Sequence, residues 1–263
     1  MGRIMEKFTQ NDVSDIWGKI WETSHDASVN AVFLHRLFID GYAVMKSYIP
    51  KDASRIIEMG AGTGRYSLKI AQEFPNTQIL VTDISESSLK VIMQLAGKLR
   101  LKNVQVQKED ITKQTFTDNS LDIIIMDCVI PHVPDYELAM HEVARVLKPG
   151  GLLVMAHVNP LNIPHTLHRY WTEHFRKSGY QYGLERAFSR KTWKRLCENN
   201  NLTIIATDGF AVGYGIYRHK VTHRAFALVG RIVNRLSKNI DKVTGRWCSR
   251  TFGFETVTVA VKK

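Results

Sequence analysis

Hydrophobic and polar residues from position 53 onward alternate between two patterns. Short apolar runs predict strands at residues 55–59, 78–82, 104–108, 121–126, 152–157, 202–207 and 255–261. Apolar residues at three- and four-residue spacing between these runs predict helices at residues 65–74, 85–99, 135–147 and 189–199. This alternation predicts an α/β fold in which helices cover a largely parallel sheet.

The first 50 residues are helical and aromatic in pattern. Trp17 and Trp21 stand four residues apart, which places both on one face of a helix. A second set keeps the spacing of a buried helix face and comprises Phe33, Leu34, Leu37, Phe38, Tyr42, Met45 and Tyr48. We expect residues 1–52 to form a helical cap, which either packs on the core or closes over a bound molecule.

Glycines occupy positions 60, 62 and 64, directly after the first predicted strand. A strand followed by a glycine turn and a helix is a nucleotide-binding arrangement, because glycine permits tight turns and close approach of a ligand to the backbone. The dinucleotide pattern G-x-G-x-x-G would place its third glycine at position 65, which is Arg65 here. An acid, Glu58, stands two residues before the first glycine. This spacing argues against a dinucleotide.

Acidic residues follow the next predicted strands in order. Asp83 follows the second strand, residues 109–111 (Glu-Asp-Ile) the third and Asp127 the fourth, and residues 147–151 (Leu-Lys-Pro-Gly-Gly) lead into the fifth. Each marker alone is weak evidence, but four at these intervals are strong. Residues 55–157 therefore resemble the class I S-adenosylmethionine-dependent methyltransferases, in particular small-molecule enzymes with a methyltransferase-11-like domain.

The resemblance implies a three-layer α/β/α Rossmann-like fold with a seven-stranded, mostly parallel sheet, an N-terminal helical cap and an inserted helical acceptor region. The implied segments are a cap at 1–52, a cofactor-binding core at 53–160, an acceptor-binding or lid region at 161–200, and closing strands with a basic amphipathic helix at 201–263. The implied cofactor is S-adenosyl-L-methionine.

The resemblance also implies where that cofactor is held. The glycine turn would line its methionine moiety, Asp83 would accept the ribose hydroxyls, and residues after the third and fourth strands would meet the adenine and the sulfonium end. The expected cofactor contacts are Glu58, Gly60, Ala61, Gly62, Gly64, Asp83, Ile84, Asp110, Ile111, Asp127 and Cys128.

The acceptor side is expected beyond the fourth and fifth strands. Methyl transfer needs an aligned acceptor and exclusion of water, and it needs a base only where the acceptor must lose a proton. Residues 127–133 lack the N/D-P-P-aromatic turn of enzymes that methylate amino groups of nucleobases or glutamine, and are closer to the small-molecule branch. His132 is the first candidate for a base or acceptor-positioning group, and His157 is the second. Residues 160–193 interleave aromatic and basic side chains, as acceptor-binding elements of this fold often do.

Residues 220–244 predict a helix with two distinct faces. Apolar residues from Val221 to Val243 keep helical spacing on one face, and Lys or Arg residues from Lys220 to Lys242 keep it on another. At about 100° per residue the two arcs are centred roughly 120° apart. Three interpretations stay open: a helix packed on the core with a solvated basic side, a peripheral membrane helix serving a lipid-like acceptor, and a surface that contacts RNA phosphates.

Charge is distributed unevenly along this chain, whose formal net charge is +11. Residues 1–150 hold 17 Lys and Arg against 19 Asp and Glu, whereas residues 151–263 hold 19 against 6. All excess positive charge therefore lies in the second half, where it bears on the choice of partner.

Cysteine and histidine spacing indicates neither a disulfide framework nor a metal site. Cys128, Cys197 and Cys248 are scattered, and His165 and His168 have no partner at ligand spacing. The start lacks the apolar core of a signal peptide, and no apolar run reaches the length of a membrane span. We expect a soluble, cytoplasmic protein.

These patterns together predict methyl transfer from S-adenosylmethionine to a small organic or lipid-like acceptor. The alternative is an RNA or protein methyltransferase that uses the basic second half as a docking surface. A cofactor-binding protein without catalytic activity stays open as well, and Arg65 disfavours a nicotinamide oxidoreductase.

Overall fold

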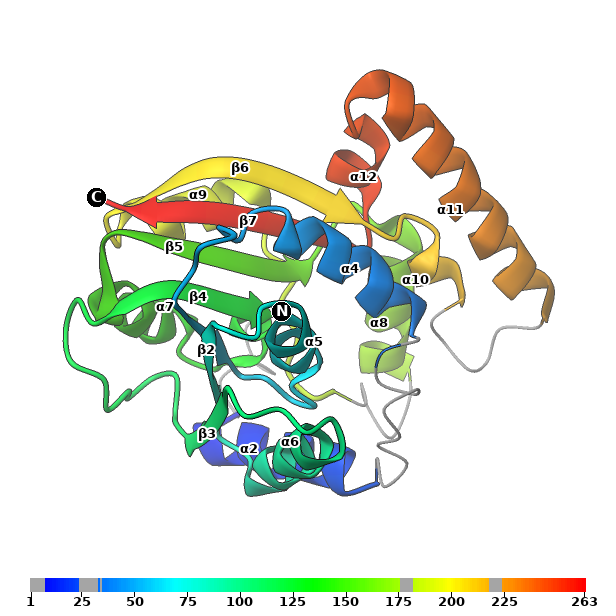
Figure 1. Cartoon of the computed structure of the whole chain (residues 1–263). Helices are drawn as coiled ribbons and strands as arrows, with labels where there is room; N and C mark the ends of the chain where they lie inside the picture. The colour runs from blue at the N-terminus through cyan, green and yellow to red at the C-terminus, as the bar shows by residue number, and fades with distance from the viewer. Residues whose placement is uncertain (1–7, 24–32, 34, 176–181, 218–223) are drawn as a thin grey trace.

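The computed structural model describes residues 8–23, 33, 35–175, 182–217 and 224–263. A seven-stranded sheet of order β3-β2-β1-β4-β5-β7-β6 runs through its centre (Figure 1). The strands are β1 (Arg55–Met59), β2 (Gln78–Asp83), β3 (Val104–Lys108), β4 (Leu121–Asp127), β5 (Leu147–Val158), β6 (Leu202–Phe210) and β7 (Glu255–Lys262). Strand β7 runs antiparallel to both of its neighbours, and the other pairs are parallel. The predicted mostly parallel, seven-stranded sheet is confirmed.

Helices lie on both faces of this sheet, with α4, α5 and α6 on one face and α7 and α9 on the other. The described helices are α2 (Gln10–Thr23), α4 (Arg36–Lys46), α5 (Arg65–Glu73), α6 (Glu86–Lys98), η1 (Ile130–His132, a 3-10 turn), α7 (Tyr136–Val146), α8 (Ile163–Phe175), α9 (Arg190–Glu198), α10 (Tyr214–Tyr217), α11 (Arg224–Thr244) and α12 (Trp247–Phe252). The three-layer α/β/α arrangement is therefore also confirmed.

The central strands are buried on both faces, which explains their continuous apolar runs. Side chains alternate between faces along a strand. Ile56 and Ile125 belong to the apolar cluster beneath α4, α5 and α6, and Ile57 and Ile124 belong to the cluster beneath α7 and α9. Two apolar cores thus pack against the two faces of the sheet. The polar residues at the strand ends lie outside these cores, where they can form a binding site.

The N-terminal part forms two described helices. Helix α4 buries Leu37, Phe38, Tyr42 and Met45 against the sheet, so the predicted buried face is confirmed at these four positions. Phe33 and Tyr48 are only partly buried, and Leu34 lies outside the described residues. Helix α2 lies against α6, near the β3 edge of the sheet (Figure 1). The side chain of Trp21 lies outside the described part.

Helix α11 is not packed on the core through its apolar face, which was the first of the three interpretations of its sequence. Its apolar residues face outward, and a set of small and polar residues faces the protein instead. The interpretation of a helix packed on the core through its apolar face is therefore wrong. Across the described ranges, no helix combines the length and the apolar character needed to cross a membrane.

Candidate active site

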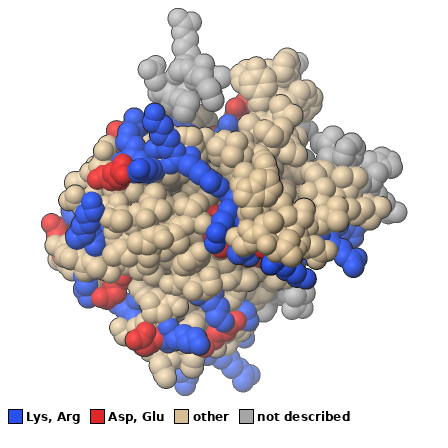
Figure 2. Space-filling model, turned by 90° about the horizontal axis from the view of Figure 1, so that it is seen from above, with Lys and Arg blue, Asp and Glu red and all other residues tan. Residues whose placement is uncertain are grey.

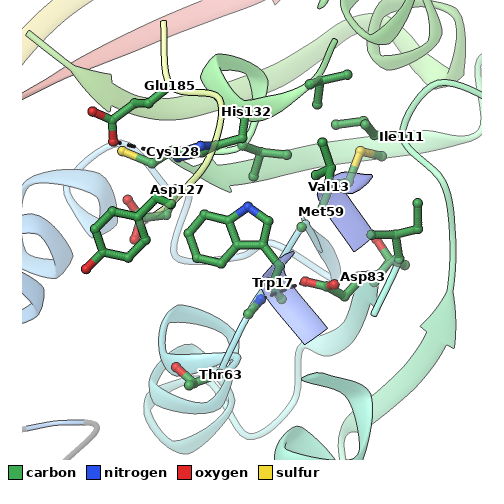
Figure 3. Close-up of a pocket in the computed structure, with 18 of the residues that line it drawn as sticks. Val13, Trp17, Met59, Thr63, Asp83, Ile111, Asp127, Cys128, His132 and Glu185 are labelled. Atoms are coloured by element: carbon green, nitrogen blue, oxygen red, sulfur yellow. Dashed lines mark hydrogen bonds and ion pairs between the residues drawn. The ribbon is translucent and has the colours of Figure 1, made fainter. Parts of the chain in front are cut away.

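A cavity of about 510 Å³ opens at the carboxyl ends of β1, β2 and β4. Ligands of open parallel sheets bind at this edge, where the strand order reverses. In this sheet the reversal lies between β1 and β4. Helix α2 covers the opening, and its Val13 and Trp17 point into the cavity (Figure 3). The volume lies within the range of about 300–1,000 Å³ that is usual for small-molecule sites.

The glycine turn after β1 forms one wall of the cavity. Gly60 and Gly62 line it, and both have positive φ angles, of 63° and 58°. A Cβ on Gly60 would lie only 2.6 Å from Cγ2 of Val129. Gly64 also has positive φ but packs toward Ile92 rather than the cavity. The turn therefore presents bare backbone to a ligand because glycine alone fits there.

Asp83 fixes this turn from the end of β2. Its carboxylate accepts hydrogen bonds from the backbone N–H groups of Gly62 and Ser85, both at 2.8 Å. Burial raises the pKa of Asp83, although these hydrogen bonds oppose the shift. Ala61 and Ile84 line the cavity beside it. Asp83 thus borders the cavity, which its expected role of holding the ribose requires.

The residues after β3 alternate in direction. Glu109 and Ile111 line the cavity, whereas Asp110 does not. The Asp110 carboxylate accepts from Nε2 of Gln10 at 3.0 Å and from the backbone N–H of Thr112 at 2.9 Å. The structure therefore places Asp110 in a turn beneath α2, and it brings Ile111 but not Asp110 to the cavity wall.

Glu58 lies outside the cavity lining and is fully buried. Its Oε2 accepts a hydrogen bond from the backbone N–H of Ser67 at 2.9 Å, in the first turn of α5. Burial raises the pKa of Glu58 to about 7, against the effect of the Ser67 hydrogen bonds. Glu58 thus braces the helix that follows the glycine turn.

An acidic group with one guanidinium lies at the end of β4. Asp127 and Cys128 line the cavity, as predicted from their position after the strand, together with Glu255 of β7. The guanidinium of Arg65 donates to Oδ2 of Asp127 at 2.8 Å. Burial lowers the pKa of Arg65, but the Asp127 carboxylate more than offsets it and the pKa is raised.

The same residues raise the question of a metal ion. Asp127, Cys128 and Glu255 each bring one ligand atom to within 4.8 Å of the others. The Arg65 guanidinium already supplies a cation to the Asp127 carboxylate. We assign no metal to this group.

A buried histidine–glutamate cluster lies beside Cys128, across the cavity from Asp83 in the view of Figure 3. His132 lies in the 3-10 turn η1, and its Nδ1 donates to the carbonyl oxygen of Leu184 at 2.5 Å, because a carbonyl can only accept. Nε2 of His132 lies 3.9 Å from Oε2 of Glu185. The other oxygen of Glu185 lies 3.0 Å from Nε2 of His165. His132 and Glu185 both line the cavity (Figure 3).

Trp17 crosses from the cap helix to this cluster. Its indole ring meets the His132 ring edge-on, with centroids 4.9 Å apart, and stacks on Tyr182 at 5.6 Å. In the view of Figure 3 the indole lies between Asp83 and Asp127. Helix α2 therefore reaches both the Asp83 side and the His132 side of the cavity.

His157, the second sequence-based candidate for an acceptor group, is not part of the cavity. Its Nε2 lies 3.0 Å from Oγ1 of Thr258, and its ring packs on Trp193 at 4.3 Å. Burial lowers the pKa of His157 to about 3. Because side chains alternate along a strand, Val158 lines the cavity and His157 faces the opposite layer. The position of a residue at the end of a strand does not by itself show whether its side chain faces the cavity, as that of Val158 does, or the opposite layer, as that of His157 does.

Several lining residues were missed by sequence reasoning. Glu185 and Gln114 come from irregular segments without a periodic pattern, so no local signal marked them. In the sequence, Arg65 stands out only as a break in the dinucleotide pattern. Its place in the first turn of α5, beside a strand that ends in Asp127, was the available signal for an ion pair.

The fold and this cavity define a class I methyltransferase: the sheet order with antiparallel β7, and a glycine turn that opens into a cavity at the strand reversal. The chain belongs to the methyltransferase domain family, whose model matches residues 50–209. S-adenosylmethionine is therefore the methyl donor, and the protein is an S-adenosylmethionine-dependent methyltransferase.

Named relatives agree with this class. A demethylmenaquinone methyltransferase of Staphylococcus carnosus is 28% identical over 143 residues, which are 54% of this chain and 58% of that protein. This chain therefore spans little more than half of that relative's length.

Solved structures share the fold at low identity. A Thermotoga maritima S-adenosylmethionine-dependent methyltransferase has a TM-score of 0.63 at 17% identity, covering 95% of this chain and 100% of that one. A Haemonchus contortus phosphoethanolamine N-methyltransferase, solved with phosphomonomethylethanolamine and S-adenosylhomocysteine, has a TM-score of 0.65 at 18% identity, covering 95% and 60%.

The cavity residues suit this donor. Both amide atoms of Gln114 are buried without a hydrogen-bond partner among the described residues, as is Oδ1 of Asp127. Such buried polar groups require a partner, which a nucleoside and an amino-acid tail supply. The described lining holds five carboxylates, those of Asp83, Glu109, Asp127, Glu185 and Glu255, against one guanidinium, that of Arg65. An acidic cavity favours a sulfonium cation.

Proposed function

We propose that this enzyme transfers the methyl group of S-adenosylmethionine to a small organic or lipid-like acceptor bound at the His132–Glu185 end of the cavity. The observation that carries the proposal is that one cavity joins the glycine turn to the histidine–glutamate cluster. The similarity to a demethylmenaquinone methyltransferase supports a small-molecule acceptor, lipid-like ones included.

The donor would be held by the first part of the chain. Gly60, Ala61 and Gly62 would face its methionine moiety, Asp83 and Ile84 its ribose and adenine, and Asp127 and Cys128 its sulfonium end. The Ile111 side chain would pack on the adenine, and the Gln114 amide would bond the adenine edge. Bound there, the donor supplies an electrophilic methyl on a good leaving group. Residues Glu58, Gly64 and Asp110 would support the turns around it.

His132 would orient the acceptor and take its proton where one must be lost. Its Nδ1 must carry hydrogen to bond the Leu184 carbonyl, so in the neutral ring Nε2 holds the lone pair. An imidazolium formed at His132 would be stabilised by the Glu185 carboxylate 3.9 Å away. Trp17 and the rest of the cap would exclude water from this end.

The acceptor class can be tested with labelled donor. The purified chain is incubated with S-adenosylmethionine labelled on the methyl group and a cell extract split into lipid, small-molecule, RNA and protein pools. We expect label in the lipid or small-molecule pool, lost or greatly reduced in His132→Ala and retained in His157→Ala, which alters no cavity residue. Label confined to RNA or protein would support the alternative function instead, and label in no pool would indicate a cofactor-binding protein.

We also propose that a lipid-like acceptor is met through peripheral membrane contact of the segment at residues 220–244, of which the structure describes residues 224–244 as helix α11. RNA is the less favoured partner for this segment, because an RNA-binding surface is built mainly from basic and stacking groups rather than exposed aliphatic ones.

A further inference from the structure

Helix α11 turns its polar face inward. The buried residues in its described part are Gly230, Asn234, Ser237 and Asp241, at spacings of four, three and four. Oδ1 of Asn234 accepts from the backbone N–H of Gly213 at 2.7 Å, and Oδ1 of Asp241 accepts from that of Ser249 at 3.1 Å. Hydrogen bonds to α12 and to the loop before α10 therefore fix the rotation of α11 about its own axis.

Close backbone packing fixes the same orientation. A Cβ on Gly213 would lie 2.1 Å from the carbonyl oxygen of Gly230, so the loop before α10 touches the α11 backbone directly. The helix cannot rotate its apolar side inward without breaking this contact.

The apolar face of α11 is consequently exposed to solvent. Its side chains are between 44% and 84% exposed, and they are Leu228, Val229, Ile232, Leu236, Ile240 and Val243. At about 100° per residue, the centre of this face lies about 140° from that of the buried face. Soluble proteins rarely leave such a continuous apolar stripe uncovered, so it marks a contact surface.

Helix α8 shows the same inversion. It buries His165, Arg169 and Thr172 at spacings of four and three. The exposed side chains are between 50% and 69% exposed, and they are Ile163, Leu167, Tyr170, Trp171 and Phe175. The buried face lies behind the cavity wall and supports it, because His165 bonds the carboxylate and Arg169 the carbonyl of Glu185, which lines the cavity.

The two inverted helices lie near one another, at the cavity end of the molecule. Helix α10 contacts both α8 and α11, and its Tyr214 lines the cavity (Figure 1). A partner seated on the outer faces of α8 and α11 would therefore lie beside the acceptor end.

Basic side chains flank the apolar face of α11. Arg231, Arg235, Lys238 and Lys242 are exposed on one arc, and Lys238 also pairs with Asp40 at 2.6 Å. On one face of the molecule, seen from above in Figure 2, Lys and Arg side chains, with some Asp and Glu among them, border broad areas without charged groups. Exposed aliphatic residues beside a basic arc are the pattern of helices that lie on anionic membrane surfaces.

We propose that the outer faces of α11 and α8, defined by the exposed apolar residues named above, dock on the surface of an anionic lipid bilayer. The apolar side chains enter the headgroup boundary, and the basic arc of α11 contacts lipid phosphates. This docking deepens the proposed function, since it delivers a lipid-like acceptor beside the His132–Glu185 end. The positive charge of residues 151–263 complements such a surface.

The test is co-sedimentation of the whole chain with vesicles of phosphatidylcholine alone or mixed with phosphatidylglycerol. We expect binding to the mixed vesicles that weakens with salt. The double variant Ile232→Asp/Leu236→Asp should lower the vesicle affinity on the order of tenfold or more, because two apolar side chains of this face are replaced by carboxylates. The matched control is Ile205→Asp on β6, whose side chain is 58% exposed and lies outside α8 and α11. Circular dichroism confirms that each variant folds.

Two further variants test separately the basic arc of α11 and the apolar face of α8. Arg231→Gln/Arg235→Gln should remove the preference for phosphatidylglycerol, and Leu167→Asp should weaken binding through α8. Absence of wild-type binding to either vesicle would overturn the proposal, as would equal binding by the α11 double variant. A wild-type dimer that Ile232→Asp/Leu236→Asp dissociates would overturn it too, by assigning this face to a second copy.

The outcome is independent of catalysis. Vesicle binding by a chain that labels no acceptor would refute the proposed function and leave the docking surface standing. Acceptor labelling in detergent by a chain that binds no vesicle would refute the docking surface and leave the proposed function standing.

Discussion

Replacing Gly60 by alanine tests the turn on which the whole site depends. Two separate costs are expected at this position. An L-residue at φ 63° carries about 1–2 kcal/mol of backbone strain. The new Cβ would also lie 2.6 and 2.7 Å from the two methyl carbons of Val129, and relieving such an overlap costs about 1–3 kcal/mol. Gly60→Ala should therefore lower the free energy of unfolding by about 2–5 kcal/mol.

A second glycine provides the control for strain alone. Gly150 has a φ of 76°, and a Cβ there would meet nothing within 4 Å. Gly150→Ala should therefore cost only the backbone term of about 1–2 kcal/mol. The overlap at Gly60 should be relieved by Val129→Ala, since only the Val129 Cβ, at 3.2 Å, would remain close. The double variant Gly60→Ala/Val129→Ala should recover most of the difference between the two glycine variants.

Urea denaturation followed by circular dichroism gives the four free energies of unfolding that this cycle needs. Titration of each variant with S-adenosylhomocysteine by calorimetry adds the affinity of the cavity, which should fall in Gly60→Ala and be unchanged in Gly150→Ala. Equal destabilisation by Gly60→Ala and Gly150→Ala would show that Val129 does not restrict the turn. Strictly additive effects of Gly60→Ala and Val129→Ala would refute the close approach as well.

Three further substitutions probe the two ends of the cavity and its surroundings. Asp83→Ala should weaken S-adenosylhomocysteine binding by about 1–3 kcal/mol in calorimetry, because the ribose hydroxyls and the buried N–H groups of the turn lose their acceptor. Glu86→Ala, which removes an exposed acid of α6, is the control, and equal affinities of Asp83→Ala and the unchanged protein would exclude the ribose role. Glu185→Gln should lower the rate of acceptor labelling by about tenfold or more while the donor affinity stays unchanged, with partial recovery in Glu185→Asp; a fall in donor affinity alone would contradict this. His157 has a folded pKa lowered to about 3, so its stabilising contribution is present above its unfolded pKa of about 6.5 and is lost as the pH falls. From about pH 7 to about pH 4.5 that loss amounts to roughly 2–3 kcal/mol, which His157→Gln should remove from the acid unfolding profile; an unchanged profile would refute it.

The glycine-turn side of the cavity was largely predictable from the sequence because it is built from local segments. The turn at Gly60 and Gly62 and the acid Asp83 each follow directly from a strand whose apolar run is visible in the chain. Parallel strands bring their carboxyl ends to one edge, so the order of these markers is enough to gather them. The pattern did not show in which direction each single side chain points. The structure places Asp110 and Glu58 behind the cavity wall rather than in it.

The His132–Glu185 end of the cavity was not predictable in this way because distant segments build it. Trp17, His132, His165 and Glu185 meet only once α2, η1, α8 and the loop before α9 are packed together. His157 illustrates the reverse case, since a suitable residue at a suitable strand end faces the wrong layer.

The sequence by itself determined the class of fold, the donor and the presence of two faces on the helix at residues 220–244. A wheel of residues shows which side chains share a face, but it cannot show which face meets the protein. The tertiary structure decided that, because Gly230, Asn234 and Asp241 fit the backbone and hydrogen-bonding groups of the loop before α10 and of α12, and aliphatic side chains do not. The apolar face was left outside for this reason.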